Sequence, residues 1–506
     1  EQQLISRWTA LNQIHFPTNV AHFEAAVHRI KFEELFVAQV RMNLLRSQRH
    51  RYSKGIVFER VGDRFNDFYQ HHLPFQLTGA QKRVIKEIRA DLGSGRQMNR
   101  LLQGDVGSGK TMVAILIMLL AVDNGHQACL MAPTEILSRQ HFNTIQPLLE
   151  KVGVRVGILT GSTRAAERRK LLAELQSGEL SMLIGTHALI EEVVQFKNLG
   201  LAIIDEQHRF GVAQRAQLQK KGIQPPHVLV MTATPIPRTL AMTAYGDLDY
   251  SVIDEMPPGR QPVKTVHRHE TRRAQVMEFI RTEIDKGRQV YIIFPLIEES
   301  AKLDYENLMK GYEQVKSWFP EPTYWISMVH GKQPADQKET NMRRFVEHDT
   351  QIMVSTTVIE VGVNVPNATV MVIESSEKFG LSQLHQLRGR VGRGGEQSYC
   401  ILMTGSKLGV DARERLAIMT ATNNGFEIAE KDLALRGPGD IEGTRQSGAL
   451  NLKLASLTQD RDLLEKAQIS AERVAEADPE LAAPEHQLLR IFLQQRMGPV
   501  RWSGIA

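Results

Sequence analysis

The sequence has 506 residues, enough for roughly three domains of ordinary size. Its 42% hydrophobic and 24% charged residues are typical of folded globular proteins, which excludes long disordered or fibrous structure. The 62 Lys and Arg residues against 57 Asp and Glu give a formal net charge of +5, which permits a polyanionic partner without requiring one. The two cysteines, Cys129 and Cys400, are far apart, so we expect neither a disulfide scaffold nor a zinc site.

The longest apolar run, 112–122, is about half as long as the roughly 20 residues that a membrane span needs. We therefore predict a buried helix there and no membrane segment. The N-terminal residues show no secretory signal, which favours a cytoplasmic location. Because the chain begins with Glu1, we also expect it to be a piece of a longer protein.

The apolar pattern divides the chain into four regions. Residues 1–72 show helical spacing and no series of strands. In 73–262, and again in 263–410, amphipathic helical stretches alternate with short apolar strands, and the turn-rich segment 254–263 is predicted to link the two series. This alternation predicts two tandem α/β domains with parallel sheets, followed by a helical region at 411–506. The expected strands are 128–134, 181–187, 201–206 and 228–234 in the first series, and 289–297, 323–331, 351–357, 368–374 and 399–405 in the second.

A phosphate-binding loop is predicted at 104–111, where GDVGSGKT fits the pattern G-x-x-x-x-G-K-[ST]. The segment follows the apolar NRLLQ and opens a helical run, so backbone N–H groups and the helix dipole can both favour phosphate oxygens. Lys110 is expected to reach the β- and γ-phosphates of ATP, and the Thr111 hydroxyl to bind Mg²⁺. The loop residues predicted to bind the nucleotide are Gly104, Gly107, Ser108, Gly109, Lys110 and Thr111.

A pair of carboxylates ends the apolar strand LAIIDE. Asp205 is expected to hold the water shell of Mg²⁺, and Glu206 to orient or deprotonate the attacking water. An acidic pair that merely caps the next helix is the alternative for an isolated DE. The phosphate loop upstream favours the catalytic interpretation.

Two further segments carry polar groups that could act together with the phosphate loop. Thr232 and Thr234 follow an apolar strand, where hydroxyls can couple the Mg²⁺ site to a nucleic-acid groove. The segment QLHQLRGRVGRGG places Gln386, Arg390 and Arg393 among glycines. The two arginines could stabilise transition-state charge on the γ-phosphate from the second domain, as an arginine finger does. A solvated basic loop that binds nucleic-acid phosphates is the alternative.

Taken in order, these segments resemble the motor of the superfamily 2 helicases. The resemblance implies ATP and Mg²⁺ as cofactors and makes Gln81, in FQLTGAQKRVI, the residue that reads adenine. The matching segments are GDVGSGKT, APTEILSRQH (132–141), TGS (160–162), GTHALI (185–190), DEQH (205–208), TATPIPR (232–238), STTVIEVGVNVPNATVMVIE (355–374) and QLHQLRGRVGR (383–393).

Two segments resemble more narrowly the RecG family of bacterial ATP-dependent DNA helicases. They are DEQHRFGV (205–212) and the stretch after the motor, FEIAEKDLALRGPGDIEGTRQSG (426–448). The resemblance implies a helicase and double-stranded DNA translocase that remodels stalled forks and branched recombination intermediates in DNA repair. It also implies 3′ to 5′ polarity, a monomer, a nucleoid location and a single-strand-binding protein as partner.

The stretch after the motor is expected to transmit closure of the cleft to DNA. The resemblance assigns this role to Arg415, Arg436 and Gln446. Its glycines predict a mobile loop, and Arg436 and Arg445 give that loop charge for phosphate binding. The N-terminus departs from the family, because residues 1–72 leave no room for its five-stranded wedge barrel.

Four alternatives remain open from the sequence. A transcription-repair coupling translocase shares the element after the motor but needs a polymerase-binding domain, and a DEAD-type RNA helicase would leave that element unexplained. A nucleic-acid-binding module with a degenerate, non-hydrolysing nucleotide site would not need the full set of catalytic residues. A metabolic phosphate-loop kinase would not need a second domain with its own arginines, and it would transfer phosphate to a small acceptor.

Overall fold

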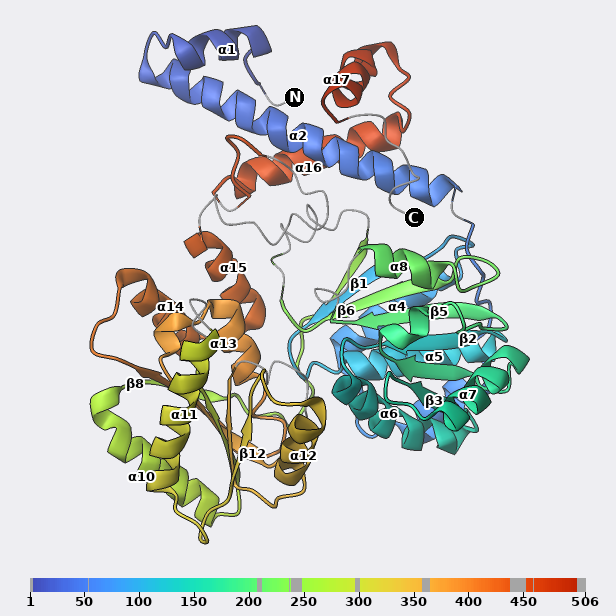
Figure 1. Cartoon of the computed structure of the whole chain (residues 1–506). Coiled ribbons are helices and arrows are strands. Elements are labelled where there is room, and N and C mark those ends of the chain that lie inside the picture. Colours follow the sequence, from blue (N-terminus) through green and yellow to red (C-terminus); the bar gives the residue numbers. More distant parts are fainter. Residues whose placement is uncertain are drawn as a thin grey trace.

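Two parallel β-sheets lie side by side, with a helical assembly of the N-terminal and C-terminal segments above them (Figure 1). The structure is a computed structural model of the chain. This arrangement confirms the predicted fold class of two tandem α/β domains with helical flanking regions. The structure describes residues 3–52, 54–206, 212–235, 237, 248–295, 301–356, 365–436, 452–457 and 459–497.

The first sheet contains seven parallel strands among the described residues, in the order β3-β4-β2-β5-β6-β1-β7. Its central strands are apolar almost throughout, because helices cover both faces of the sheet. Neighbouring residues on one strand, such as Leu101 and Leu102, therefore belong to cores on opposite faces. The strands are β1 (Asn99–Gly104), β2 (Gln127–Met131), β3 (Val156–Leu159), β4 (Met182–Gly185), β5 (Leu199–Asp205), β6 (His227–Thr232) and β7 (Asp249–Ile253).

The helices of the first domain divide between those two cores. Residues of α4, α5 and α6 pack on one face, and residues of α7 and α8 pack on the other. A capping box fixes the start of α4, since Thr78 and Gln81 satisfy each other's backbone N–H groups. The helices are α4 (Gly79–Leu92), α5 (Lys110–Asp123), α6 (Glu135–Leu149), α7 (Ala165–Ser177) and α8 (Val212–Gln219).

The second sheet contains six parallel strands in the described part of the chain, in the order β10-β11-β9-β12-β13-β8. One core joins it to α12, α13, α14 and α15, and another to α10 and α11. The strands are β8 (Lys264–His269), β9 (Gln289–Ile293), β10 (Ile326–Val329), β11 (Ile352–Ser355), β12 (Ala368–Ile373) and β13 (Tyr399–Thr404). The helices are α10 (Arg273–Asp285), α11 (Ala301–Trp318), α12 (Ala335–Val346), α13 (Leu381–Arg388), α14 (Val410–Ala421) and α15 (Gly425–Arg436).

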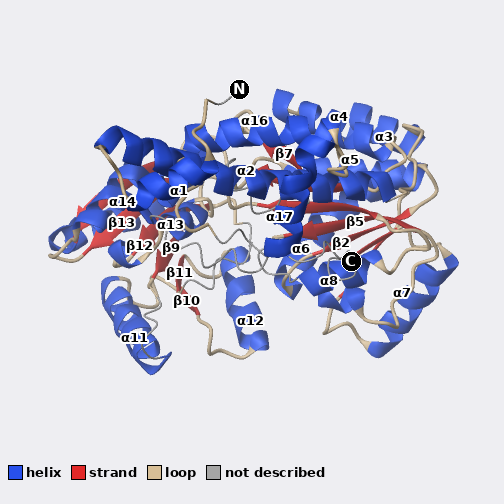
Figure 2. Cartoon of the chain, turned by 90° about the horizontal axis from the view of Figure 1, so that it is seen from above, coloured by secondary structure: helices blue, strands red, loops and turns tan. Residues whose placement is uncertain are grey.

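The long helix α2 runs above both sheets, and α16 packs along it (Figures 1 and 2). The carboxylate of Glu34 on α2 accepts hydrogen bonds from three successive backbone N–H groups, those of residues 453–455. At the far end of α2, Arg46 pairs with Asp249 of β7 and so ties the helix to the first domain. The helices are α1 (Arg7–His15), α2 (Val20–Tyr52), α3 (Asp63–Asp67), α16 (Arg461–Ala477) and α17 (Gln487–Met497).

The apolar helix expected after the phosphate loop is α5, and its residues from Met112 to Ala121 are buried in the first domain. None of the helices in the described ranges combines the length and the apolar character that a bilayer span requires.

Candidate nucleotide site and motor cleft

The phosphate loop lies between β1 and α5, as the sequence predicts. Gly107 and Gly109 have φ values of 79° and 85°, in the left-handed region that residues with a Cβ adopt only at a cost. The hydroxyl Oγ of Ser108 is buried without a hydrogen-bond partner. A buried hydroxyl without a hydrogen-bond partner destabilises the protein, and an acceptor on a ligand removes that cost. The loop is therefore suited to a phosphate oxygen.

The side chain of Gln81 is hydrogen-bonded to the backbone of this loop. It is fully buried, and its Nε2 donates to the carbonyl oxygen of Ser108 over 2.8 Å while its Oε1 accepts from the backbone N–H of Thr78 over 2.9 Å. A Cβ on Gly109 would lie 2.2 Å from the same Nε2, so this position requires glycine. Gln81 thus connects the first turn of α4 to the loop, and its role as reader of adenine stays a prediction.

Lys110 points its ammonium group back into the loop. Its Nζ donates to the carbonyl oxygens of Gly104 over 2.7 Å and of Asp105 over 3.0 Å. Burial lowers the pKa of Lys110, and the carboxylates of Glu206 and Asp205 oppose that shift. The site therefore brings the predicted lysine close to both predicted carboxylates. Thr111, the first-turn neighbour of Lys110 on α5, is half-buried.

Asp205 ends β5, with its carboxylate held from two sides. Its Oδ2 is 2.8 Å from Nε2 of His141 on α6, and its Oδ1 accepts from the backbone N–H of Glu206 over 3.1 Å. Burial alone raises the pKa of Asp205, but the hydrogen bond from His141 and the charge of Lys110 outweigh it and hold the pKa below its usual value. Asp205 is thus kept ionised. Sequence reasoning did not single out His141, which is separated from Asp205 by 64 residues.

The pKa of Glu206 is shifted in the opposite direction from that of Asp205. Its pKa is raised, first by burial and then by the charge of Asp205, while Lys110 and Arg390 partly offset the rise. Its φ of 54° is positive, which is uncommon for a residue other than glycine and concentrates at functional sites. A carboxylate with a raised pKa is the better proton acceptor of the two.

Two threonines link this edge of the sheet to the second domain. Thr232, buried at the end of β6, accepts a hydrogen bond on Oγ1 from the backbone N–H of Thr234 over 3.2 Å. Oγ1 of Thr234 in turn accepts from Nε2 of Gln386 on α13 over 2.6 Å. The cleft is therefore bridged between two predicted site residues.

The segment that carries the predicted arginines packs against the phosphate loop, since a Cβ on Gly389 would lie 2.8 Å from Cβ of Val106. Arg390 acts electrostatically on Glu206, and Arg393 on Lys110. Burial, and then the neighbouring charge of Arg390, lower the pKa of Arg393 to about 9. Cations gathered at one place repel one another, and a polyanion bound among them would relieve that repulsion.

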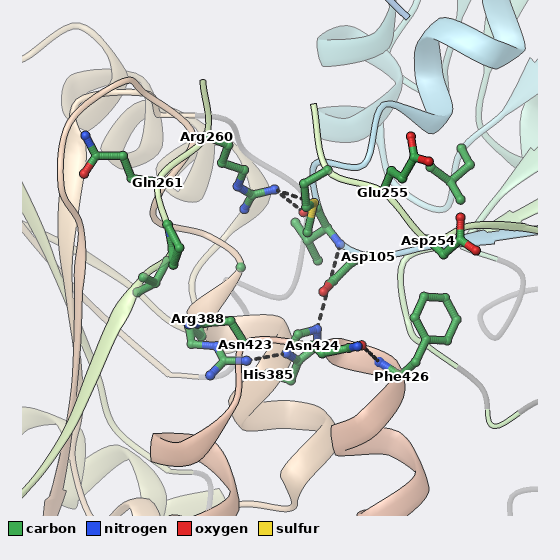
Figure 3. Close-up of a pocket in the computed structure, with 16 residues that line it drawn as sticks. Asp105, Asp254, Glu255, Arg260, Gln261, His385, Arg388, Asn423, Asn424 and Phe426 are labelled. Atoms are coloured by element: carbon green, nitrogen blue, oxygen red, sulfur yellow. Dashed lines mark hydrogen bonds and ion pairs between the residues drawn. The ribbon is translucent and has the colours of Figure 1, made fainter. Parts of the chain in front are cut away.

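A cavity of about 380 Å³ lies between the domains beside the phosphate loop (Figure 3). Arg260, from the segment between β7 and β8, crosses its wall: one Nη donates to the carbonyl oxygen of Val106, and Nε donates to that of Gly392 over 2.9 Å. Sequence reasoning placed this arginine only in a linker. The residues labelled in Figure 3 are Asp105, Asp254, Glu255, Arg260, Gln261, His385, Arg388, Asn423, Asn424 and Phe426.

The residues predicted to act on DNA are described only in part. Arg415 lies on α14, and its Nη2 donates to the carbonyl oxygen of Glu377 over 2.8 Å. Arg436 ends α15, but its side chain lies outside the described residues, as do Arg445 and Gln446 entirely. The same holds for parts of three expected motifs, at 207–211, 238–247 and 357–364.

Together, the two parallel-sheet domains and the cleft between them define a superfamily 2 helicase motor. Family models agree with this class: DEAD/DEAH box helicase matches residues 78–243, and the helicase conserved C-terminal domain matches 272–395. A third model, ATP-dependent DNA helicase RecG, domain 3, C-terminal, matches 422–506. The chain belongs to the RecG family of ATP-dependent DNA helicases.

Individual relatives support this membership. The chain is 51% identical over 98% of its length to the RecG of Synechocystis sp. and covers 59% of that protein. It is 47% identical over 98% of its length to the RecG of Streptococcus pneumoniae and covers 73% of it. A solved structure of RecG bound to a three-way DNA junction matches 92% of the chain with a TM-score of 0.74 and 43% identity, and the chain covers 60% of it. The chain thus spans only part of the length of these relatives.

Proposed function

We propose that this chain is the motor of an ATP-dependent DNA helicase, a double-stranded DNA translocase that remodels stalled replication forks and branched recombination intermediates in repair and recombination. The observation that carries the proposal is the cleft: a Cβ on Gly389, the residue before Arg390, would lie 2.8 Å from Cβ of Val106 in the phosphate loop, so the arginine segment of one domain packs against the nucleotide site of the other. A motor needs such a shared site, because hydrolysis must change the force between two domains.

The chain's own residues suit ATP as the nucleotide. The buried Ser108 hydroxyl and the backbone of the phosphate loop would bind the β- and γ-phosphates with Lys110. Mg²⁺, which supplies charge neutralisation to the phosphates when bound, would be held by Thr111 and Asp205. Such a site fits, since Mg²⁺ usually keeps several waters and takes only one or two protein ligands besides phosphates.

In the proposed hydrolysis, the two carboxylates with opposite pKa shifts and the two arginines have separate roles. Glu206, the better proton acceptor, would orient the attacking water and take its proton. Arg390 and Arg393 would stabilise the charge that develops on the γ-phosphoryl oxygens. Release of the products removes the anion that attracts both domains, so the cleft can open and a bound duplex can be moved stepwise.

We propose domain boundaries at 1–72, 73–262, 263–410 and 411–506. The second boundary is supported by the stretch between β7, which ends at Ile253, and β8, which begins at Lys264. The first region is the helical segment that joins the motor to a wedge domain of the parent protein, and the last carries the translocation element. We assign Arg415, Arg436, Arg445 and Gln446 to DNA translocation, together with Thr232 and Thr234.

We infer that branched duplex DNA is the macromolecular partner, supported by the relative whose structure is bound to a three-way junction. We further propose a monomer that moves with 3′ to 5′ polarity, acts at the bacterial nucleoid in the cytoplasm and contacts a single-strand-binding protein. Analytical ultracentrifugation of the chain with and without a junction tests the monomer.

The proposal is tested by ATP hydrolysis with no DNA, single-stranded DNA, linear duplex, forked DNA and structured RNA, all at one moderate salt concentration. We expect forked and duplex DNA to stimulate hydrolysis more than RNA does. Stimulation by RNA above DNA would support an RNA helicase instead. Nucleotide binding without hydrolysis under every condition would support a binding module.

A further inference from the structure

A histidine that the proposed mechanism does not use lies at the centre of the cleft. His385 of α13 is buried, and its Nε2 is 2.6 Å from Oδ1 of Asp105 in the phosphate loop (Figure 3). The same Oδ1 accepts the backbone N–H of Val106 over 2.7 Å, so the carboxylate orients the loop's own backbone. His385 thus contacts the nucleotide site without belonging to its set of phosphate-binding or proton-accepting groups.

The other ring nitrogen fixes the tautomer of His385. Nδ1 is 3.0 Å from Nη2 of Arg388, and a guanidinium can only donate hydrogen bonds. Nδ1 must therefore accept, which leaves the proton on Nε2, where it is donated to Asp105. A directed chain of hydrogen bonds runs from Arg388 through His385 to Asp105, across the two domains.

Arg388 is fixed at the point where α14 ends. Its Nη1 donates to the carbonyl oxygens of Met419 over 2.9 Å and of Thr422 over 2.8 Å. Two residues further on, Asn424 accepts the backbone N–H of Phe426 on its side chain over 3.0 Å and so caps the start of α15. The hydrogen-bonded chain therefore reaches the helix that leads into the proposed translocation element.

The first residue of α15 touches the same junction directly. A Cβ placed on Gly425 would lie 2.5 Å from Nε2 of His385 and 2.8 Å from Oδ2 of Asp105, and 2.6 Å from Cγ of Pro235 in the loop that follows β6. Only glycine permits this approach. Four segments therefore meet at one point: the phosphate loop, the loop after β6, helix α13 and the start of α15.

We propose that His385 is a positioning residue that couples the nucleotide state of the phosphate loop to α15, by holding Asp105 from one side while Gly425 abuts both residues. Movement of the loop on nucleotide binding shifts Asp105, and the hydrogen bond and the close contact carry that shift to the start of α15. The inference rests on the proposed function for its purpose, but the contact can be tested without DNA.

The test is hydrogen exchange of the 506-residue chain with and without the β,γ-imido analogue of ATP and Mg²⁺, in peptides that cover 104–112 and 425–436. In the unmodified chain and in His385→Gln, we expect the analogue to change exchange in both peptides. Glutamine can accept from Arg388 on its oxygen and donate to Asp105 from its nitrogen. In His385→Ala, the change at 104–112 should persist and the change at 425–436 should be lost.

Two matched controls accompany the test. His71→Ala removes another histidine–aspartate contact, between His71 and Asp67 on the exposed surface. In this variant the analogue should change exchange at 425–436 as it does in the unmodified chain. Gly425→Ala should also lose the response at 425–436, whereas Gly409→Ala, where a Cβ meets nothing within 4 Å, should keep it.

Three results would overturn the proposal. The first is a change in exchange at 425–436 in His385→Ala as large as in the unmodified chain, and the second is loss of the change at 104–112 in that variant. The third is no change in exchange at 425–436 when the unmodified chain binds the analogue. DNA-stimulated ATP hydrolysis is measured separately on the same variants. If DNA fails to stimulate the unmodified chain, the proposed function fails, but the exchange result still decides the coupling.

Discussion

Gln386 on α13 of the second domain donates a hydrogen bond to Thr234 over 2.6 Å and thereby joins that helix to the loop after β6 in the first domain. In the proposed ATP cycle the cleft closes and opens, so a bond across it strengthens and weakens with the nucleotide state. These two residues should therefore act as one unit in catalysis.

We predict that Gln386→Ala and Thr234→Val each lower kcat of DNA-stimulated hydrolysis and leave KM for ATP nearly unchanged. The double variant should be little worse than either single variant, since both remove the same bond, with a coupling free energy of about 1 kcal/mol. Steady-state kinetics of the unmodified chain, the two single variants and the double variant measures this double-mutant cycle. Strictly additive effects would show that the two side chains act independently.

Lys110→Ala should abolish ATP hydrolysis, because Lys110 carries the ammonium group in the phosphate loop. Duplex binding should be largely retained, because the ammonium group of Lys110 points into the phosphate loop. Phosphate release and fluorescence anisotropy of a labelled duplex measure the two properties. Full hydrolysis in this variant would refute the assignment of the site.

Arg390→Ala and Arg393→Ala should each lower kcat by about 10³-fold or more, as loss of an arginine finger does. Binding of a fluorescent ATP analogue should change far less, since the arginines stabilise charge that develops in the transition state. Arg268→Ala, which removes an exposed arginine from β8 of the same domain, is the matched control. A loss of nucleotide affinity as large as the loss of kcat would argue for ground-state binding instead.

Gln446→Ala and Arg436→Ala should preserve much of the ATPase activity while they impair movement along duplex DNA. The reason is that the family resemblance places both residues in the element that transmits cleft closure, outside the phosphate site. Hydrolysis and displacement of a third strand from a triplex, measured on the same preparations, separate the two activities. Equal loss of both would contradict a transmission role.

The sequence predicts the scaffold well because the physical signals of the scaffold are local. An apolar strand such as β5 (Leu199–Asp205), followed by acidic residues, marks both a buried strand and the edge of the sheet where it ends. Glycines at 107 and 109 mark the phosphate loop for the same kind of reason, since the backbone there has positive φ. The strands β1, β3, β7 and β8 were not among those named from the pattern; β8, for example, is half-exposed and rich in charge.

What the sequence could not supply are contacts between distant segments. His141 meets Asp205 from 64 residues away, and His385 meets Asp105 from 280 residues away. A single histidine in an amphipathic helix has no local signal that distinguishes such a partner from ordinary core packing. Arg260 likewise lies in a turn-rich stretch whose composition indicates only a linker, although it bridges the two domains.

The central claim is that this chain converts ATP hydrolysis into movement along duplex DNA, and displacement of the third strand from a triplex by the unmodified chain tests it most directly. We predict displacement that requires ATP and Mg²⁺, fails with the β,γ-imido analogue and is absent from Lys110→Ala. Rapid DNA-stimulated hydrolysis with no displacement on any duplex would contradict the claim.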